Sequence, residues 1–208
     1  MTKALKNEIV CHGLRVLRSR HRDIRKLKRD HTPAVHGFRV WASSWLLVDF
    51  FKHRGLKHGT QVMDVGCGWG LAGIYCAKYH HAAVTSVDID SDVFPFLHLH
   101  AGLNDTKIIS LQDSFDDISS ERLENTEVLI GADICFWDSM VDSLINLICR
   151  ALHRGVHLVV IADPGRSPFF ELGDYFCTRG MGSCHGRWVQ DPHFIQGYIL
   201  KVACRIHS

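Results

Sequence analysis

Long apolar stretches are absent from this 208-residue sequence. No run of about 18 uninterrupted apolar residues occurs, so we expect no membrane-spanning helix and no membrane partner. The N-terminus also lacks the apolar stretch and cleavage site of a secretory signal. No C-x-x-C pair occurs among the eight cysteines, and the spacing of Cys177, Cys184 and His185 matches no standard zinc pattern. We therefore expect reduced thiols, no metal and a cytoplasmic location, with the mitochondrial matrix left open.

Charge is unevenly distributed along the chain. Residues 1–30 contain ten Lys and Arg but only three acidic residues, whereas the whole chain carries a net charge of +2. Apolar or half-polar residues recur here at helical steps: Leu14, Leu17, His21, Ile24 and Leu27. We predict a basic N-terminal helix over residues 1–30 that docks by one face, followed by a main domain over residues 31–208. Such a segment also suits an acidic partner, nucleic acid or a membrane surface.

From residue 61 onward, short β-branched apolar runs alternate with longer segments of helical period. The predicted strands are Gln61–Val65, Ala83–Val87, Lys107–Leu111, Glu127–Ile134, Val156–Ala162, His185–Val189 and Phe194–Cys204. The predicted helices are Val40–Lys52, Leu71–Tyr79, Val93–Ala101, Ser139–Leu152 and Phe169–Arg179, with a linker over Asp30–Phe38. This alternation predicts an α/β fold with a mostly parallel seven-stranded sheet.

Three glycines alternate directly after the first of these strands. Asp64 lies near the end of the strand, and Gly66, Gly68 and Gly70 follow it. Glycine at a strand-to-helix turn permits a positive φ and lets a ligand approach bare backbone. The stretch therefore predicts a loop that binds a nucleotide cofactor, with the Asp64 carboxylate beside it.

The carboxylates near this loop favour one cofactor over another. Gly68-x-Gly70-x-x-Gly73 also satisfies a dinucleotide fingerprint. However, the Asp64 carboxylate repels a pyrophosphate and pairs with the ammonium of a cofactor that carries an amino acid. Asp88 ends the next strand, where it is placed to accept hydrogen bonds from a ribose diol. Together these positions favour S-adenosylmethionine, and an NAD-dependent oxidoreductase remains an alternative.

Two of these motifs carry a family resemblance. DVGCGWG at residues 64–70 and SVDID at residues 86–90 resemble the first and second motifs of the class I, seven-strand methyltransferases. The resemblance implies a Rossmann-like three-layer sandwich and S-adenosylmethionine as cofactor. It also implies that Asp113, after the third strand, contacts the adenine amine.

A third motif narrows the resemblance. Asp133-Ile134-Cys135-Phe136 is similar to the D-x-x-Y signature of the family-16 methyltransferases, with Phe136 in place of tyrosine. That group includes lysine methyltransferases and predicted nicotinamide N-methyltransferases. The helix that carries Trp41 also matches, and residues 163–166 look like the DPGR segment of the electron-transfer-flavoprotein β-subunit lysine methyltransferases. We expect Trp41, which precedes the glycine loop, and Asp133, at the carboxyl edge of the sheet, to contact the cofactor.

The residues after the fourth and fifth strands are candidates for the chemistry. Asp133 lies at the carboxyl edge of the sheet, where open α/β folds bind ligands, and we expect it to steer or deprotonate an amine. Phe136 and Trp137 supply aromatic walls suited to a cationic methyl donor or an amine, Phe136 in catalysis and Trp137 on the substrate side. Arg166 is placed to orient a substrate group at the rim.

These residues predict a monomeric S-adenosylmethionine-dependent N-methyltransferase that acts on a lysine side chain of a protein. A small amine of the pyridine type is the alternative substrate. Nucleic acid is less favoured, because the segment after Asp133 has no proline as in the D/N-P-P-Y/F/W motif, although the basic N-terminus keeps it open. A non-catalytic binding module on the same fold is the remaining alternative.

Overall fold

The computed structural model describes residues 3–5, 7–34 and 36–203, so that Cys204, the predicted end of the last strand, lies outside the described residues. The strands are β1 Lys3–Leu5, β2 Glu8–Cys11, β3 Leu14–Leu17, β4 Gln61–Val65, β5 Ala83–Asp88, β6 Ile109–Gln112, β7 Val128–Ala132, β8 Leu158–Asp163, β9 Gly182–Val189 and β10 Ile195–Val202. The helices are α1 Arg22–Asp30, α2 Ser43–Arg54, α3 Leu71–His80, α4 Phe94–Leu103, α5 Ser120–Glu124, α6 Val141–His153 and α7 Ser167–Thr178, with 3-10 turns at Ser91–Val93 and Asp138–Met140.

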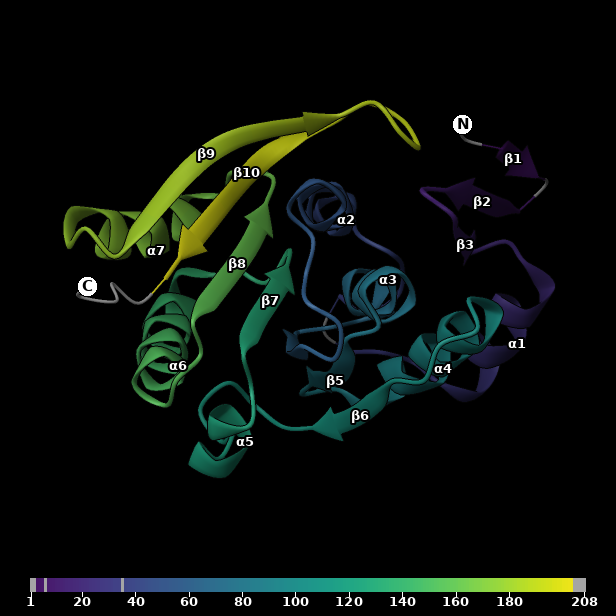
Figure 1. Cartoon of the computed structure of the whole chain (residues 1–208). Coiled ribbons are helices and arrows are strands. Elements are labelled where there is room, and N and C mark those ends of the chain that lie inside the picture. Colours follow the sequence, from purple (N-terminus) through teal and green to yellow (C-terminus); the bar gives the residue numbers. More distant parts are fainter. Residues whose placement is uncertain (1–2, 6, 35, 204–208) are drawn as a thin grey trace.

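The main sheet has the strand order β6-β5-β4-β7-β8-β10-β9 (Figure 1). Strands β4 to β8 are parallel, β10 runs antiparallel to β8, and β9 runs antiparallel to β10. The predicted α/β fold with a mostly parallel seven-stranded sheet is therefore confirmed. Because β5 and β6 lie on one side of β4 and β7 and β8 on the other, the strand order reverses at β4, and a crevice forms at that edge.

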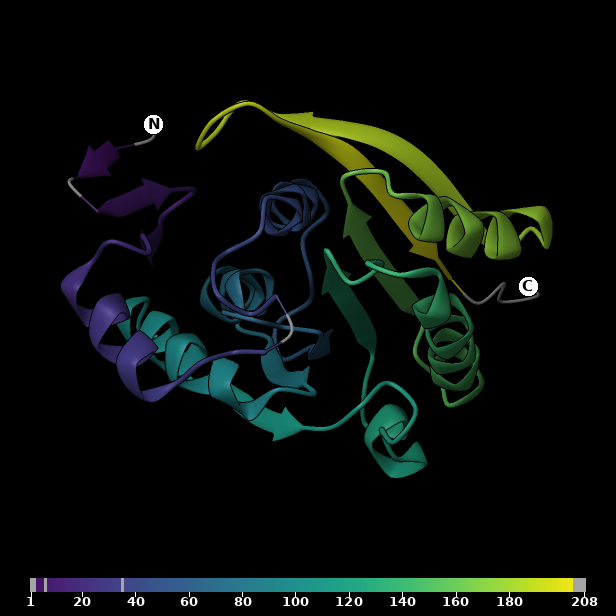
Figure 2. The same cartoon turned by 180° about the vertical axis from the view of Figure 1, so that it is seen from behind.

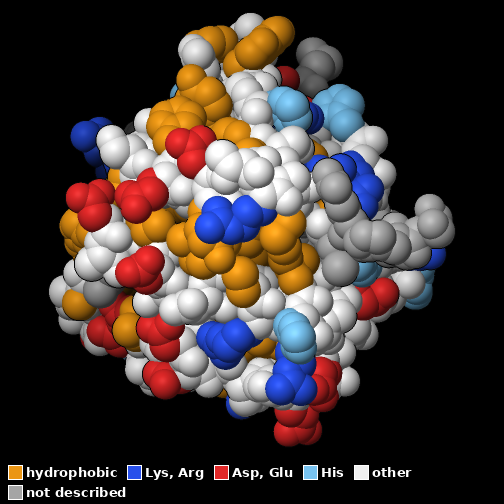
Figure 3. All heavy atoms as spheres, turned by 90° about the vertical axis from the view of Figure 1, so that its left-hand side faces the viewer, with side chains coloured by type: hydrophobic (Ala, Val, Ile, Leu, Met, Phe, Trp, Pro, Cys, Tyr) orange, Lys and Arg blue, Asp and Glu red, His pale blue; other side chains and the backbone are white. Residues whose placement is uncertain are grey.

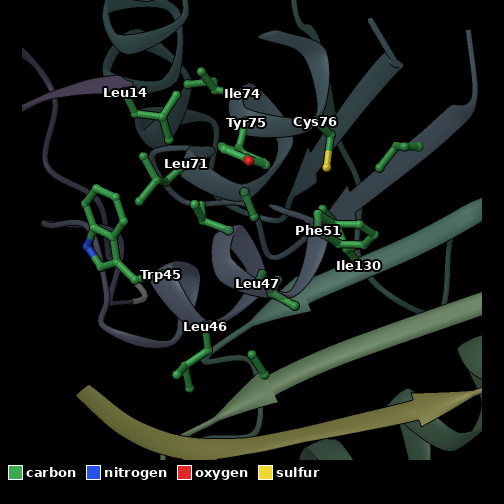
Figure 4. Close-up of a cluster of buried hydrophobic side chains, with 14 of the residues drawn as sticks. Leu14, Trp45, Leu46, Leu47, Phe51, Leu71, Ile74, Tyr75, Cys76 and Ile130 are labelled. Atoms are coloured by element: carbon green, nitrogen blue, oxygen red, sulfur yellow. The ribbon is translucent and has the colours of Figure 1, made fainter. Parts of the chain in front are cut away.

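Helices cover both faces of this sheet, with α2 and α3 on one face and α6 and α7 on the other (Figures 1 and 2). A hydrophobic core lies on each face of the sheet, and alternate residues of β7 point into one or the other. Val128 and Ile130 face α2 and α3, and Leu129 faces α6. Figure 4 shows the first core, where Phe51 of α2 lies beside Ile130 and Ile74 of α3 lies farther along the same cluster, near Leu14. All four are fully buried, and burial of such side chains stabilises the fold by about 1.5–3 kcal/mol each.

The predicted N-terminal helix over residues 1–30 is wrong for its first part. The structure has a three-stranded antiparallel sheet there, and only α1, Arg22–Asp30, is helical. His12 and Gly13 both have positive φ, 49° and 72°, which is the geometry of a two-residue hairpin turn. On β3, Leu14 and Val16 are buried while Arg15 is exposed, which is the alternation of a strand.

This N-terminal sheet and α1 pack against α4. The backbone N–H of Leu17 donates to Nε2 of the buried His100 (3.1 Å), and the Asn104 side chain bonds both backbone groups of Arg15 (2.8 Å each). The division of the chain at residue 30 stays a prediction. Among the described residues, no helix is long and apolar enough to cross a membrane.

Candidate active site

Three cavities lie side by side at the carboxyl edge of the parallel strands. The central cavity, about 310 Å³, lies between the loops that follow β4, β5, β6 and β7. The loop cavity is small, about 30 Å³, and lies against the glycine loop after β4. The outer cavity, about 420 Å³, lies between the N-terminal sheet, the start of α2 and the loops after β8 and β9.

The glycine loop forms the floor of the first two cavities. Gly66, Gly68 and Gly70 all have positive φ, between 51° and 71°, as predicted from their positions at a strand-to-helix turn. A β-carbon at Gly68 would meet no protein atom within 4 Å, so it would enter the cavity itself. A β-carbon at Gly70 would lie 2.0 Å from the Leu97 side chain. The loop therefore leaves room for a ligand at Gly68 and for helix packing at Gly70.

Asp88 connects the end of β5 to this loop. Its carboxylate accepts hydrogen bonds from the backbone N–H of Gly68 (2.9 Å) and of Asp90 (3.1 Å) and lines the central cavity. Burial raises the pKa of Asp88 above its usual value, and the two backbone donors oppose that rise. Its remaining lone pairs are placed for a ligand hydroxyl at the cavity wall.

Asp64 lies beneath the loop, with only 3% of its surface exposed. Its Oδ2 accepts a hydrogen bond from the backbone N–H of Gly73 (3.2 Å), and the residue lines the loop cavity. Burial raises the pKa of Asp64 to about 8, and the neighbouring Asp88 adds to the rise. A cationic group in the loop cavity would bring this carboxyl group back to its ionised form.

Arg39 lines the same loop cavity and was not predicted as a site residue. Its guanidinium lies 4.0 Å from the ring centroid of Trp41, and no carboxylate of the described residues forms an ion pair with it. The sequence holds no signal for this placement, because Arg39 lies just outside the helix and only folding of the linker brings it over the glycine loop.

Asp133 and Arg166 form an ion pair between the ends of β7 and β8, in which the carboxylate is buried and the arginine side chain is 24% exposed. Arg166 donates from Nη2 to Asp133 Oδ1 (2.6 Å) and from Nη1 to Asp163 Oδ2 (3.1 Å). The other oxygen of Asp133 accepts from the backbone N–H of Ser43 at the start of α2 (2.9 Å). Asp163 is fully buried, and the sequence identified it only as part of the turn before Arg166.

An aromatic cluster covers the Asp133 end of the central cavity. The His36 ring stacks on the Phe136 ring, with 4.4 Å between centroids, and Trp41 meets the edge of both rings. Trp41 also donates from Nε1 to the His36 carbonyl (2.8 Å), which holds the linker across the cavity. Trp137 is half exposed beside them. His36 was missed at the sequence level, because nothing in its sequence position marks it among the fifteen histidines.

The structure brings the predicted site residues together. Those that line the central cavity, the loop cavity or both are Trp41, Asp64, Gly66, Gly68, Gly70, Asp88, Asp113, Asp133, Phe136 and Trp137. Arg166 lines the outer cavity instead and reaches the central one through Asp133. Their roles in binding and catalysis stay predictions.

The donor set of these cavities fits S-adenosylmethionine. The bare loop at Gly68 and the Asp88 carboxylate offer a place for a nucleoside. Asp64 and Arg39, which both line the loop cavity, offer one group of each charge for the ammonium and the carboxylate of an amino acid. The buried Asp64 carboxyl group beside the loop does not suit a pyrophosphate. The NAD alternative therefore has no support from the lining.

Solved structures with the same fold are methyltransferases. The methyltransferase domain of bacterial CtHen1 matches with a TM-score of 0.59 at 12% identity, over 77% of this chain and 97% of that one. TrmK of M. capricolum, solved with S-adenosylhomocysteine, matches with a TM-score of 0.55 at 8% identity, over 79% and 68%. The fold is that of the class I S-adenosylmethionine-dependent methyltransferases. Residues 22–167 match the family described as lysine methyltransferase, and the chain belongs to this family.

Three curated relatives agree with that family. Methyltransferase-like protein 22 of Mus musculus is 27% identical over 156 residues, 62% of this chain and 39% of the relative. The histidine protein methyltransferase 1 homolog of Dictyostelium discoideum is 30% identical over 142 residues, 63% and 45%. The electron transfer flavoprotein beta subunit lysine methyltransferase of Xenopus laevis is 28% identical over 144 residues, 64% and 56%. The matches span about two fifths to just over half the length of these relatives.

Proposed function

We propose that this protein transfers a methyl group from S-adenosylmethionine to a lysine side chain of another protein. The observation that carries the proposal is the aromatic cluster of His36, Trp41 and Phe136 at the Asp133 end of the central cavity. Such a wall suits an amine beside a cationic sulfur. The family to which the chain belongs, and relatives named as lysine and histidine protein methyltransferases, support a protein substrate.

The cofactor is assigned to the central and loop cavities together. We assign Asp88 to the ribose hydroxyls, Asp113 to the adenine amine, and Asp64 and Arg39 to the ammonium and carboxylate of the methionine end. When bound, the cofactor supplies a methyl carbon activated by a positively charged sulfur. The protein needs to add only alignment, which contributes roughly 7–11 kcal/mol to lowering a barrier of this kind.

The acceptor amine must be neutral when it attacks the methyl carbon. The rings of Phe136 and Trp41 remove water from the amine, and desolvation lowers the pKa of a cationic amine. The proton then leaves to solvent at the half-exposed side of the cavity beside Trp137. No strong base is required in this arrangement.

Asp133 suits a positioning role better than proton abstraction. Both of its oxygens already accept hydrogen bonds, from Arg166 and from the backbone of Ser43. By holding the start of α2, the carboxylate places Trp41, two residues earlier, against the cavity. We therefore replace the base predicted from the sequence by a residue that fixes the wall of the acceptor site.

Histidine is a second candidate acceptor, because one relative is named as a histidine protein methyltransferase. The face in Figure 3, which carries α6 and α7, offers no site for nucleic acid, whereas the cations clustered on α1 lie on another side of the molecule and leave that acceptor as an alternative. Acidic side chains gather along one half of that face, and its Lys and Arg side chains stand apart from one another. Binding to a phosphate backbone requires clustered cations.

The test uses the full chain with tritiated S-adenosylmethionine and separate cytosolic and mitochondrial extracts. We expect label in the protein fraction and, after acid hydrolysis, in methylated lysine. Asp133→Ala should lose transfer by about 100-fold and keep its affinity for S-adenosylhomocysteine. Label confined to RNA or to small molecules would overturn the proposal, and label in methylated histidine would move it to the second acceptor.

A further inference from the structure

The outer cavity lies outside the space assigned to the cofactor. Its walls include Ile9 of β2 and Val16 of β3, together with Trp45 of α2 and Pro164 after β8. None of these four residues lines the central or loop cavity. At about 420 Å³ the outer cavity is large enough for side chains of a second ligand.

Four residues line both the outer cavity and the cofactor site, namely Arg39, Val40, Trp41 and Asp133. Trp41 lines all three cavities, and Asp133 lines the central and the outer one. Arg39 and Val40 separate the outer cavity from the loop cavity, and toward the central cavity the shared wall is one indole ring and one ion-paired carboxylate. A group that enters from the outer cavity meets the cofactor at the aromatic cluster, where the methyl transfer has been proposed to occur.

Part of the outer wall comes from segments of the chain beyond the family match at residues 22–167. Ile9 and Val16 precede it, and His193, between β9 and β10, follows it. The tip of the β9–β10 hairpin reaches over α2 toward the N-terminal sheet (Figures 1 and 2). These two additions complete a wall that the matched segment forms in its larger part, so part of the shape of the cavity is set outside the matched segment.

The N-terminal wall is held in place. Ile9 and Val16 are directly opposite each other in the β2–β3 pair and therefore lie on the same face. Bonds from Leu17 to His100 and between Arg15 and Asn104 fasten β3 to α4. A fixed apolar wall loses little entropy when a ligand packs on it.

The lining is apolar at the N-terminal side, and its charged or polar side chains are Arg39, Asp133, Arg166 and His193. Ile9, Val16, Val40, Trp45 and Pro164 form the apolar part, and Asp133 and Arg166 lie at the inner end. We propose that the outer cavity binds an apolar side chain next to the acceptor residue of an extended protein substrate, with the acceptor itself passing Trp41. This inference rests on the proposed function and adds a specificity pocket to it.

The test uses a pool of 13-residue peptides with one central lysine or histidine and either leucine or serine at the neighbouring positions. Initial rates with tritiated S-adenosylmethionine give kcat/KM for each peptide. We expect leucine-flanked peptides to be preferred by about tenfold, the discrimination typical of one apolar group in a pocket. Preference for serine, equal use of both, or no labelling of any peptide would overturn the inference.

Two adjacent residues of β2 provide matched variants. Ile9→Trp fills the outer cavity, whereas Val10→Trp adds the same bulk on the opposite face, where its cross-strand partner Arg15 is exposed. Ile9→Trp should raise KM for the leucine-flanked peptide about tenfold and erase the preference. Val10→Trp should keep both. The affinity for S-adenosylhomocysteine, measured by calorimetry, should stay unchanged in the two variants.

The outcomes separate this inference from the proposed function. If the two tryptophan variants behave alike, or if Ile9→Trp weakens cofactor binding as much as it raises KM, the pocket is refuted while lysine methylation stands. If the wild-type protein labels only histidine peptides, the lysine assignment fails. The pocket is then tested by measuring KM and the leucine preference of the same two variants with the histidine peptides. If extract label appears only in small molecules, both fail.

Discussion

Arg166 Nη2 lies 2.6 Å from Asp133 Oδ1, and this contact joins the ends of two neighbouring parallel strands. Asp133 has a positive φ of 58°, an uncommon conformation for a residue with a side chain. The Arg166 guanidinium also lies 4.4 Å from the Phe136 ring centroid. One arginine therefore fixes the carboxylate, the ring and the strained backbone that shape the acceptor side of the site.

Removal of Arg166 should destabilise the protein strongly. Arg166→Ala leaves Asp133 and Asp163, 3% and 0% exposed, as buried carboxylates without their cation. Loss of one partner of a buried ion pair costs about 3–5 kcal/mol. Urea denaturation measures the change. The matched control is Arg154→Ala, which breaks the exposed pair with Glu124 and should cost about 1 kcal/mol or less. Equal losses in the two variants would contradict the structural role of Arg166.

Asp64→Asn should make the ligand-free protein more stable at pH 7. Burial raises the pKa of Asp64 to about 8, whereas the same group in the unfolded chain ionises near pH 4. At pH 7, folding must therefore either bind a proton at Asp64 or bury its negative charge. The stabilising effect of that raised pKa is complete below pH 4 and is lost as the pH rises toward 8. The gain from the substitution is up to about 4 kcal/mol at pH 7.

Thermal unfolding at pH 5 and at pH 7 tests this prediction. Because the wild-type penalty grows with pH, the difference in Tm between Asp64→Asn and wild type should be larger at pH 7. The asparagine side chain can still accept the hydrogen bond from Gly73, so packing is preserved. A variant less stable than wild type at both pH values would show that Asp64 stabilises the loop as a carboxylate.

The same residue should make cofactor binding depend on pH. An ammonium group in the loop cavity requires ionised Asp64, so binding below pH 8 releases a proton. The affinity for S-adenosylhomocysteine should therefore fall between pH 7.5 and pH 6, by at most about tenfold per pH unit. Calorimetry in buffers of different ionisation enthalpy measures both the affinity and the proton release. The pH dependence should be absent in Asp64→Asn, and a flat wild-type profile would remove Asp64 from the ammonium site.

Alanine at Gly68 and at Gly70 should have different effects. Both positions have positive φ, so alanine costs roughly 1–2 kcal/mol at either one. At Gly70 the β-carbon also meets the buried Leu97, so Gly70→Ala should show the larger loss of Tm. At Gly68 it enters the ligand space, so Gly68→Ala should show the larger loss of affinity for S-adenosylhomocysteine. The reverse ranking would place the cofactor elsewhere.

Docking of the N-terminal sheet should weaken in acid. Burial lowers the pKa of His100, whose Nε2 accepts the Leu17 N–H while Nδ1 donates to the Phe96 carbonyl. A lowered pKa contributes stability that is complete above pH 6.5 and is lost as the pH falls through the folded value. Amide-exchange protection of Leu17 should therefore drop between pH 7.5 and pH 5. His100→Gln, which keeps an acceptor, should lack this drop, and an equal drop in both proteins would assign it to another group.

The motifs that name the cofactor were predictable because they are local. Gly66, Gly68 and Gly70 lie within one short turn, and Asp88 ends the next strand. Each of these two motifs can therefore be recognised from a few neighbouring residues. The predicted strand Gln61–Val65 coincides with β4 for the same reason. By contrast, the spacing of Leu14 and Leu17 fits a helical period, and only the pairing with β2 made this segment a strand, in which the two leucines pack into different clusters.

The amino-acid sequence by itself determined the seven-stranded α/β fold, the cofactor class and the edge of the sheet where chemistry occurs, because periodicity and short motifs record them. Only the tertiary structure decided that Arg39 lies over the glycine loop, that His36 stacks on Phe136, and that residues from both ends of the chain enclose one cavity. Those contacts join residues far apart along the chain. The pattern of neighbouring residues in the sequence does not predict these contacts, because they form only when the linker and the two hairpins pack over the sheet.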